Sequence, residues 1–324
     1  MASVLPILGC PASSDSGDGA NAQQGPKKIA VQLNWYAEAE HGGIFQGVAD
    51  GSYKSAGLDV EIRSGGPNAP IVAEVVMGRA MFAIANADDV VLARQQEAPI
   101  VALMAVAQNH PRCVLVRDDS PAQSLQDLKG MTFQAQAGRG YLSYMEKLGL
   151  LDGVKMVPYG GSVSALSDNP NVAIQGYSYS EPFVAKSANI PTRSLMVSDL
   201  GWNPYSSVLV TSESTIKEYP KQVAAFVGAT RKAWATYLED PENANAEILK
   251  MNQQGMMTDA LQFGAEGLRE LALPDGLSAD QLGMMTAERW QTLVQQMTDL
   301  GLCDEDTVKA EDCFTLQFLN VPAE

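Results

Sequence analysis

The stretch "LNWYAEAEHGGIFQG", residues 33–47, places an indole and an imidazole close together at the end of an apolar run. Trp35 closes the run, and His41, one of the two histidines of the chain, follows six residues later. An indole face stacks on flat heteroaromatic molecules, and a neutral imidazole offers one hydrogen-bond donor and one acceptor. Two interpretations are open here: both residues contact a ligand, or the indole packs between two lobes beside a solvated histidine.

A second polar group follows the apolar run in "AIANADDVV". Asn86 and Asp88 stand where an expected strand, 81–86, gives way to an expected helix, 87–98. In open α/β sheets, ligands bind beyond the C-terminal ends of the strands, where helix N-termini present free N–H groups. We therefore expect Asn86 and Asp88 either to contact a ligand or to cap this helix.

Two further segments supply polar and aromatic side chains in the middle of the chain. "QAQAGRGYLS" places Arg139 in a glycine-flanked turn before a helix, without the spacing or the lysine of a phosphate-binding loop. "GYSYSEP" supplies Tyr177, Tyr179 and Glu181, which share one side if the segment is extended. Glu181 could accept a hydrogen bond from a ligand amino group, or it could be a surface charge before a proline.

Motifs for catalysis are missing from the sequence. It has no HExxH, GxSxG or CxxC, and no GxGxxG that opens a helix after a strand. Its four cysteines and two histidines are too few and too scattered for a zinc site. We therefore expect a binding protein without enzyme activity, cofactor or metal.

Length and charge narrow the class of protein further. A chain of 324 residues exceeds what one hydrophobic core usually serves, so two packed lobes are expected. The formal net charge of −16 repels polyanions, which argues against binding to nucleic acid or to an anionic membrane surface. No apolar run approaches the roughly 20 residues that a membrane span needs.

Short β-rich runs alternate with helical stretches from residue 27 onward, which predicts an α/β protein with a mainly parallel sheet. A second series of such units begins near residue 113, and after residue 212 the chain is helical for over a hundred residues. We expect two α/β lobes joined by two crossings, with a ligand cleft between them and a helical C-terminal return. The expected divisions are a leader remnant and linker (1–26), lobe 1 (27–112 plus 206–324) and lobe 2 (113–205). The last helix is expected over 278–301, with a capping box at its start.

The opening segment resembles that of the periplasmic substrate-binding proteins of ABC importers, which have the type II periplasmic-binding-protein fold. The nearest likeness is the thiamin-pyrimidine-precursor (NMT1/THI5-like) branch, which is related to sulfonate and taurine binders, and it covers about residues 28–240. The likeness rests on these residues: Leu33, Asn34, Trp35, His41, Gly51, Tyr53, Lys54, Gly57, Leu58, Asp59, Val60, Tyr177, Glu181 and Pro182.

The resemblance implies a monomer that delivers a thiamin pyrimidine precursor to an ABC membrane permease. The ligand contacts that we expect are Trp35, His41, Asn86, Asp88, Arg139, Tyr177 and Glu181. One alternative is a binder of an alkylsulfonate, taurine, nitrate or a flavin, since an anion would need Arg112, Arg117 or Arg139 at the cleft. Of these three arginines, only Arg139 lies on an expected ligand-facing turn.

The resemblance also raises an enzyme alternative. Eukaryotic relatives of this fold make the thiamin pyrimidine from pyridoxal phosphate, with a cofactor lysine near the third strand and a cysteine cluster. This chain has Ala85 where that lysine is expected, and it has no such cluster.

Cysteines at the two ends of the chain suggest its compartment. "MASVLPILGC" resembles a bacterial lipobox, which implies acylation of Cys10 and a lipid-anchored protein of the periplasm or cell surface. It departs from that pattern because no Lys or Arg precedes Cys10 and only nine residues do; the alternative is a polar tail with an incidental cysteine. Cys303 and Cys313 bracket a short acidic loop, which a disulfide could close in such a compartment; the alternative is two unpaired thiols.

The lipobox interpretation predicts that the full-length product, expressed in its source cell, incorporates labelled fatty acid and partitions into detergent. Cys10→Ser should abolish both, because the thiol is the acylation site. A wild-type protein that carries no label would contradict the prediction.

Overall fold

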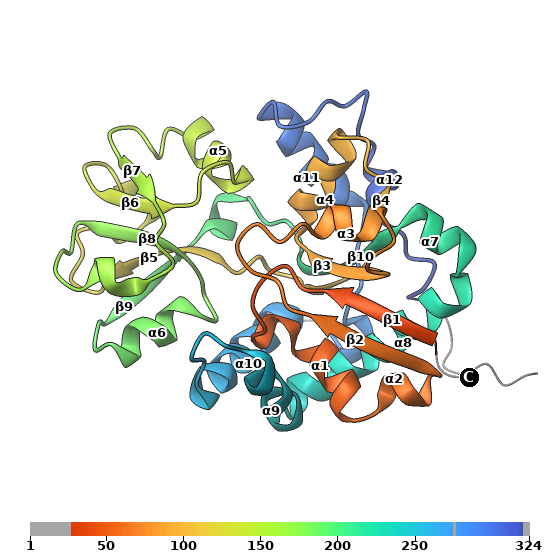
Figure 1. The fold of residues 1–324 in the computed structure, drawn as a ribbon. Helices are drawn as coiled ribbons and strands as arrows, with labels where there is room; N and C mark the ends of the chain where they lie inside the picture. Colours follow the sequence, from red (N-terminus) through yellow and green to blue (C-terminus); the bar gives the residue numbers. More distant parts are fainter. Residues whose placement is uncertain (1–26, 275–276, 320–324) are drawn as a thin grey trace, which may run out of the picture.

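The computed structural model describes residues 27–274 and 277–319, which form two α/β lobes (Figure 1). Each lobe contains one five-stranded sheet, which confirms the expected α/β class and the two-lobe architecture. Cys10 lies outside the described ranges. Among the residues described, no helix is both long enough and apolar enough to cross a membrane.

The first sheet has the strand order β2-β1-β3-β10-β4. Its strands are β1 (Lys27–Gln32), β2 (Leu58–Arg63), β3 (Phe82–Ala85), β4 (Ile100–Ala107) and β10 (Ser206–Ser212). β1 pairs in parallel with β2 and β3, whereas β10 is antiparallel to β3 and β4. The sheet is therefore mixed, because β10 returns from the second lobe and enters between two strands of the first.

The second sheet has the order β7-β6-β8-β5-β9. Its strands are β5 (Arg112–Arg117), β6 (Thr132–Ala135), β7 (Lys155–Pro158), β8 (Val172–Tyr177) and β9 (Thr192–Met196). β6 is parallel to β7 and β8, and β5 is antiparallel to β8 and β9. Four strands of each sheet therefore run in the same direction, which confirms the expected mainly parallel sheet, and one strand of each, β10 or β5, runs against its neighbours.

Helices cover both faces of the first sheet (Figure 1). The α-helices are α1 (Gly42–Ala49), α2 (Ser52–Ser55), α3 (Ile71–Val76), α4 (Ala87–Gln95), α5 (Gly140–Lys147), α6 (Glu181–Ser187), α7 (Glu213–Glu218), α8 (Pro220–Glu239), α9 (Glu242–Met251), α10 (Thr258–Ala272), α11 (Ala287–Asp299) and α12 (Ala310–Cys313). Short 3-10 helices are η1 (Ala39–His41), η2 (Leu125–Asp127), η3 (Val163–Leu166), η4 (Val197–Leu200) and η5 (Ala279–Gln281). In Figure 1, α1, α2, α8, α9 and α10 lie below this sheet, and α3, α4, α11 and α12 lie above it.

The expected helix over 278–301 is interrupted. Its first turn, η5, does start with the capping box of Ser278, but the chain then bends at Gly283, which has a left-handed φ of 84°. The carbonyl of Gly283 accepts a hydrogen bond from the N–H of Ala105 at 3.1 Å, so tertiary pairing with β4 replaces helix here. Thr286 caps the new start, and α11 follows.

Two chain segments cross between the lobes and are bonded to one another. The N–H of His110 donates to Oδ1 of Asn203 at 2.7 Å, and Nδ2 of Asn203 donates to Oδ1 of Asn109 at 3.2 Å. The Arg289 guanidinium donates to the backbone carbonyl of Asn203. These bonds hold the start of β5 beside the segment that leads into β10.

The structure corrects the predicted disulfide. Cys303 and Cys313 are separate, buried thiols. Sγ of Cys303 lies 3.4 Å from the Thr298 hydroxyl, and Sγ of Cys313 lies 3.5 Å from the carbonyl of Lys309. Both belong to a hydrophobic core cluster, so packing rather than a bridge orders the acidic loop between them.

Aromatic stacking anchors α8 to the lower face of the first sheet. The Phe226 ring stacks on Tyr53 and Phe82, with centroid distances of 5.0 and 4.1 Å. In both contacts the two rings are nearly parallel, and all three rings are buried. The alternation of β3 places Phe82 on this face and Ala83 on the other, toward α4 and α11.

Phe226→Ala should lower the free energy of unfolding by about 3–5 kcal/mol, because it leaves a cavity between two rings. Urea denaturation measures this loss. Lys232→Ala, at an exposed position of the same helix, is the control and should change stability by less than about 0.5 kcal/mol. Equal effects of the two substitutions would disprove the assignment of Phe226 to the core.

Candidate functional site

Trp35 lies in the loop between β1 and η1 and is 38% exposed. Its ring meets that of Tyr36 edge to face, at a centroid distance of 5.3 Å. The indole therefore presents a free face to solvent and is not part of the core, unlike Trp202, Trp234 and Trp290.

His41 is placed differently from either interpretation of the sequence, because its side chain is completely buried. Its Nε2 lies 2.8 Å from Oδ1 of Asn34 and 3.2 Å from Oε1 of Glu40. Its Nδ1 accepts a hydrogen bond from the N–H of Glu38 at 3.4 Å. Both ring nitrogens have protein partners, so in this arrangement His41 holds the loop and Glu40 in place and does not face a ligand.

Glu40 connects the two lobes. Its Oε2 accepts a hydrogen bond from the Tyr179 hydroxyl at 2.8 Å, and both groups are buried. Burial alone would raise the pKa of Glu40, but His41 and the Tyr179 hydroxyl bring it below its ordinary value, so Glu40 stays ionised. Gly267 permits this closeness, because an added Cβ would lie 2.8 Å from Cβ of Tyr179.

Asn86 caps α4 and also reaches the second lobe. Its side chain accepts a hydrogen bond from the Ser206 hydroxyl at 2.8 Å, and its Nδ2 donates to the Tyr177 hydroxyl at 3.4 Å. Asp89 completes the capping box by accepting from the N–H of Asn86. Of the two alternatives that the sequence left open, the structure shows the cap, and it places the capping residue beside Tyr177 of the second sheet.

Asp88 has a buried oxygen without a partner. Its Oδ1 has no hydrogen-bond donor among the described residues. Burial, followed by the neighbouring charge of Asp89, raises the pKa of Asp88 to about 7, although Arg139 and Arg112 oppose the shift. An acceptor left unsatisfied in this way costs about 1–3 kcal/mol, which a ligand donor would relieve.

Arg139 occupies the N-cap position of α5 without a capping hydrogen bond, and its guanidinium has protein partners. Its Nε and Nη2 donate to Oε1 of Gln136 at 3.3 and 2.9 Å, and its Nη1 lies 3.6 Å from Oδ1 of Asp89. This ion pair also joins the lobes. Arg139 therefore lies at the junction, where its Nε and Nη2 are bonded to Gln136 and its Nη1 is paired with Asp89.

Tyr177, Tyr179 and Glu181 do lie together, but not on one side of an extended segment. The N–H of Ser180 donates to the carbonyl of Tyr177, so the chain turns after β8 and Glu181 begins α6. Glu181 accepts hydrogen bonds from the N–H of Tyr177 at 2.6 Å and from the Tyr159 hydroxyl at 3.3 Å. Burial raises the pKa of Glu181, and both of its oxygens have protein partners.

Arg112 is a junction residue that the sequence favoured less than Arg139, because only Arg139 was expected on a ligand-facing turn. Its guanidinium carbon lies 4.2 Å from the ring centroid of Tyr177 and 5.3 Å from that of Tyr141. Burial would lower the pKa of Arg112, but Tyr177, Tyr141 and Glu181 raise it, so the charge persists. The signal in the sequence was its place: a charged residue at a predicted crossing, directly before the apolar strand.

The junction as a whole is aromatic and acidic. Five carboxylates from the two lobes surround two guanidinium groups: Glu38, Glu40, Asp88, Asp89 and Glu181 around Arg112 and Arg139. Among the described residues, no cluster of three or more His, Cys, Asp or Glu side chains is suited to a metal ion. The arrangement can stack a flat molecule and hydrogen-bond its edge.

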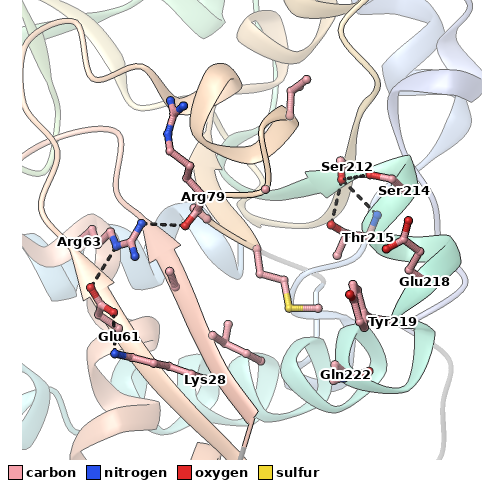
Figure 2. Close-up of a pocket in the computed structure, with 16 residues that line it drawn as sticks. Lys28, Glu61, Arg63, Arg79, Ser212, Ser214, Thr215, Glu218, Tyr219 and Gln222 are labelled. Carbon is pink, nitrogen blue, oxygen red and sulfur yellow. Dashed lines mark hydrogen bonds and ion pairs between the residues drawn. The ribbon is translucent and has the colours of Figure 1, made fainter.

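A separate hollow of about 680 Å³ lies on the first lobe (Figure 2). None of the predicted site residues lines it. Its cationic residues are paired, with Lys28 and Arg63 on Glu61 and with Arg79 on Glu74. The remaining labelled side chains, at the end of β10 and along α7 and α8, are hydroxyls, the Glu218 carboxylate and the Gln222 amide.

Solved structures with the same arrangement define the class of fold. A putative periplasmic sulfonate-binding protein SsuA from Methylobacillus flagellatus KT has a TM-score of 0.66 and 15% identity, and the match covers 91% of this chain and 93% of that one. The desulfurization enzyme DSZB has a TM-score of 0.61 and 15% identity, with 91% and 98% covered. Identities this low show the shared fold alone, which is that of the periplasmic binding proteins.

Sequence comparison then gives the family. The model described as "NMT1/THI5 like" matches residues 38–244, which is more than half of the chain, and the chain therefore belongs to the NMT1/THI5-like family. It is similar to the riboflavin-binding protein RibY of Chloroflexus aurantiacus, with 24% identity over 92% of this chain and 88% of the relative. It is also similar to the formylaminopyrimidine-binding protein of Halalkalibacterium halodurans, with 26% identity over 97% and 96%.

The raised pKa of Asp88 predicts a pH-dependent contribution to stability. The folded protein retains a proton near pH 7 that the unfolded chain releases near its ordinary pKa of 3.8. The stability of the fold should therefore fall as pH rises from about 4 to about 7, and level off above that range. Asp88→Asn removes this titration, so its melting temperature should fall less than that of the wild type between about pH 5 and about pH 8. Parallel melting curves would contradict the prediction.

Proposed function

We propose that this protein is an extracytoplasmic solute-binding protein that delivers a small heteroaromatic ligand, a thiamin pyrimidine precursor, to an ABC membrane permease. The observation that carries the proposal is the junction of the lobes, where aromatic and hydrogen-bonding side chains converge. The contacts that cross it include those of Tyr179 with Glu40, Tyr177 with Asn86, and Arg139 with Asp89. Trp35 precedes η1, which contains Glu40, by a few residues, so we propose that its exposed indole faces this junction.

The surroundings of the site favour a neutral or amino-bearing aromatic ligand. The carboxylates at the junction outnumber the guanidinium groups, which disfavours a free anion such as an alkylsulfonate. The tyrosines and the indole provide flat faces for stacking. The relative named for binding a formylaminopyrimidine supports this ligand class, and the relative named for binding riboflavin makes a flavin the second candidate.

We propose a binding protein rather than an enzyme, although one structural neighbour is named as an enzyme. Both nitrogens of His41 are occupied. Cys113 is buried, and burial raises the pKa of its thiol to about 12, which keeps it protonated and unreactive. The relatives named above as binding proteins support the same conclusion.

The remaining parts of the proposal follow from the sequence and from the relatives. Acylation of Cys10 would anchor the protein outside the cytoplasm, with 27–112 and 206–324 forming the first lobe and 113–205 the second. We expect the protein to work as a monomer. The periplasmic name of the sulfonate-binding neighbour supports the extracytoplasmic location.

Titration with the formylaminopyrimidine should quench tryptophan fluorescence, and a hundredfold excess over the dissociation constant should stabilise the fold by about 2.7 kcal/mol. Trp35→Ala should weaken binding at least about tenfold, because it removes a stacking face. The same change should alter the free energy of unfolding by less than about 1 kcal/mol, since the indole is exposed.

Trp35→Phe is the matched control, which keeps a flat face and should retain most of the affinity. Calorimetric titration and thermal melts on the three proteins measure both quantities. Unchanged affinity in Trp35→Ala would remove the indole from the site, and absence of binding by any heteroaromatic molecule would overturn the proposed function.

A further inference from the structure

The hydrogen-bonding groups at the lobe junction divide into those with protein partners and those without. Glu40, Glu181 and His41 are bonded to the protein through all of their polar side-chain atoms. Two groups differ: the Arg112 guanidinium and Oδ1 of Asp88. These two are therefore the side chains that the fold leaves unsatisfied at this place.

The Arg112 guanidinium makes no hydrogen bond and no ion pair with any described residue, and its Nε is shielded from solvent. It is nevertheless fixed in position, because its face lies over the Tyr177 ring and close to that of Tyr141. An arginine held by its flat face presents its N–H groups outward in one plane. Arg139 offers the contrast, since Gln136 and Asp89 already occupy its donors.

Asp88 supplies the opposite chemistry from the first turn of α4. Its Oδ1 is buried and receives no hydrogen bond from a described residue. The charge of Arg112 lowers the pKa of Asp88, and the charges of both residues shift the pKa of Tyr177, in opposite directions. The Tyr177 ring contacts the Arg112 guanidinium, and the Tyr177 hydroxyl accepts a hydrogen bond from Asn86, two residues before Asp88. An unpartnered donor group from β5 and an unpartnered acceptor from α4 thus lie near the same tyrosine.

We infer that Arg112 and Asp88 together bind a planar heterocycle by an edge that has a hydrogen-bond acceptor next to an N–H donor. Arg112 donates to the acceptor, which is a ring nitrogen or a carbonyl oxygen, and Asp88 accepts from the N–H. An aminopyrimidine, a formylamino group and the imide edge of a flavin all have this pattern. The inference rests on the proposed function, because it states how the same site selects its ligand.

A sulfonate fits this pair poorly. It has acceptors for Arg112 but no donor for Asp88, and it brings a negative charge toward a junction rich in carboxylates. The Tyr177 and Tyr141 rings favour a flat partner beside the guanidinium. The structure therefore assigns selectivity to the donor and acceptor order along the ligand edge.

The experiment is calorimetric titration of the full chain with four probes: the formylaminopyrimidine, its analogue with the ring amino group replaced by methyl, riboflavin and taurine. Arg112→Met keeps the side-chain stem over Tyr177 but removes every donor. Arg117→Met is the matched control, at the other end of β5, where the guanidinium pairs with Asp119. Arg112→Met should bind the heterocycle about ten- to a hundredfold more weakly, and the control should match the wild type.

The role of Asp88 is tested by a cycle of ligand and protein changes. Replacing the ligand amino group by methyl should weaken binding to the wild type about tenfold or more, and should have little further effect in Asp88→Ala. A residue with only a structural role would lower the melting temperature without changing this coupling. Arg112→Lys, which keeps the charge and loses the planar fork, provides a second variant if Arg112→Met does not fold.

Each outcome decides the inference. Loss of affinity in Arg112→Met together with a coupled loss in the Asp88 cycle supports it. Equal affinity of the wild type and Arg112→Met for a heterocycle overturns it and leaves the proposed function standing. Binding of taurine in preference to every heterocycle, or of none of the probes, overturns the proposed function and the inference with it.

Discussion

The guanidinium of Arg112, together with that of Arg139, balances the carboxylates that meet where the two lobes join. Burial and the charges of Glu40 and Glu181 raise the pKa of Glu38 well above its ordinary value, which shows how unfavourable this concentration of negative charge is. Arg112 lies among these groups and lowers the pKa of Glu40, Asp88, Asp89 and Glu181 against the effect of burial. The close approach of the lobes depends on this charge, because removing one partner from a buried ionic cluster leaves the others uncompensated.

The tyrosines at the junction separate structural roles from binding roles. The Tyr179 hydroxyl donates a hydrogen bond to Glu40, and the Tyr159 hydroxyl donates one to Glu181. These two carboxylates therefore have structural roles: Glu40 joins the lobes, and Glu181 fixes the start of α6. Tyr177 instead offers its ring to Arg112 and its hydroxyl to Asn86. Charged residues in the same cluster thus differ in function according to whether a neighbouring hydroxyl satisfies them.

The fold alone does not decide what this protein does. The same two-lobed architecture occurs in a protein named for sulfonate binding and in one named as a desulfurization enzyme. Function must therefore be argued from the side chains at the junction. In this chain they combine an exposed indole, a tilted pair of tyrosine rings, one arginine without hydrogen-bond partners and one carboxylate with an unpartnered oxygen.

Local patterns in the sequence determined the α/β class, most element ranges and the cap at Asn86, because periodicity and capping involve residues only a few positions apart. They also placed Trp35 in a loop after a strand. Contacts across the fold decided the rest. Pairing with Ala105 interrupts a predicted helix at Gly283. Contacts with Asn34 and Glu40 occupy the His41 ring, so that this residue supports Glu40 in place of lining the site. The Arg112 guanidinium is left without hydrogen bonds, whereas that of Arg139 is bonded to Gln136. This difference depends on which donors and acceptors the fold brings together, and the spacing of residues in the sequence does not encode it.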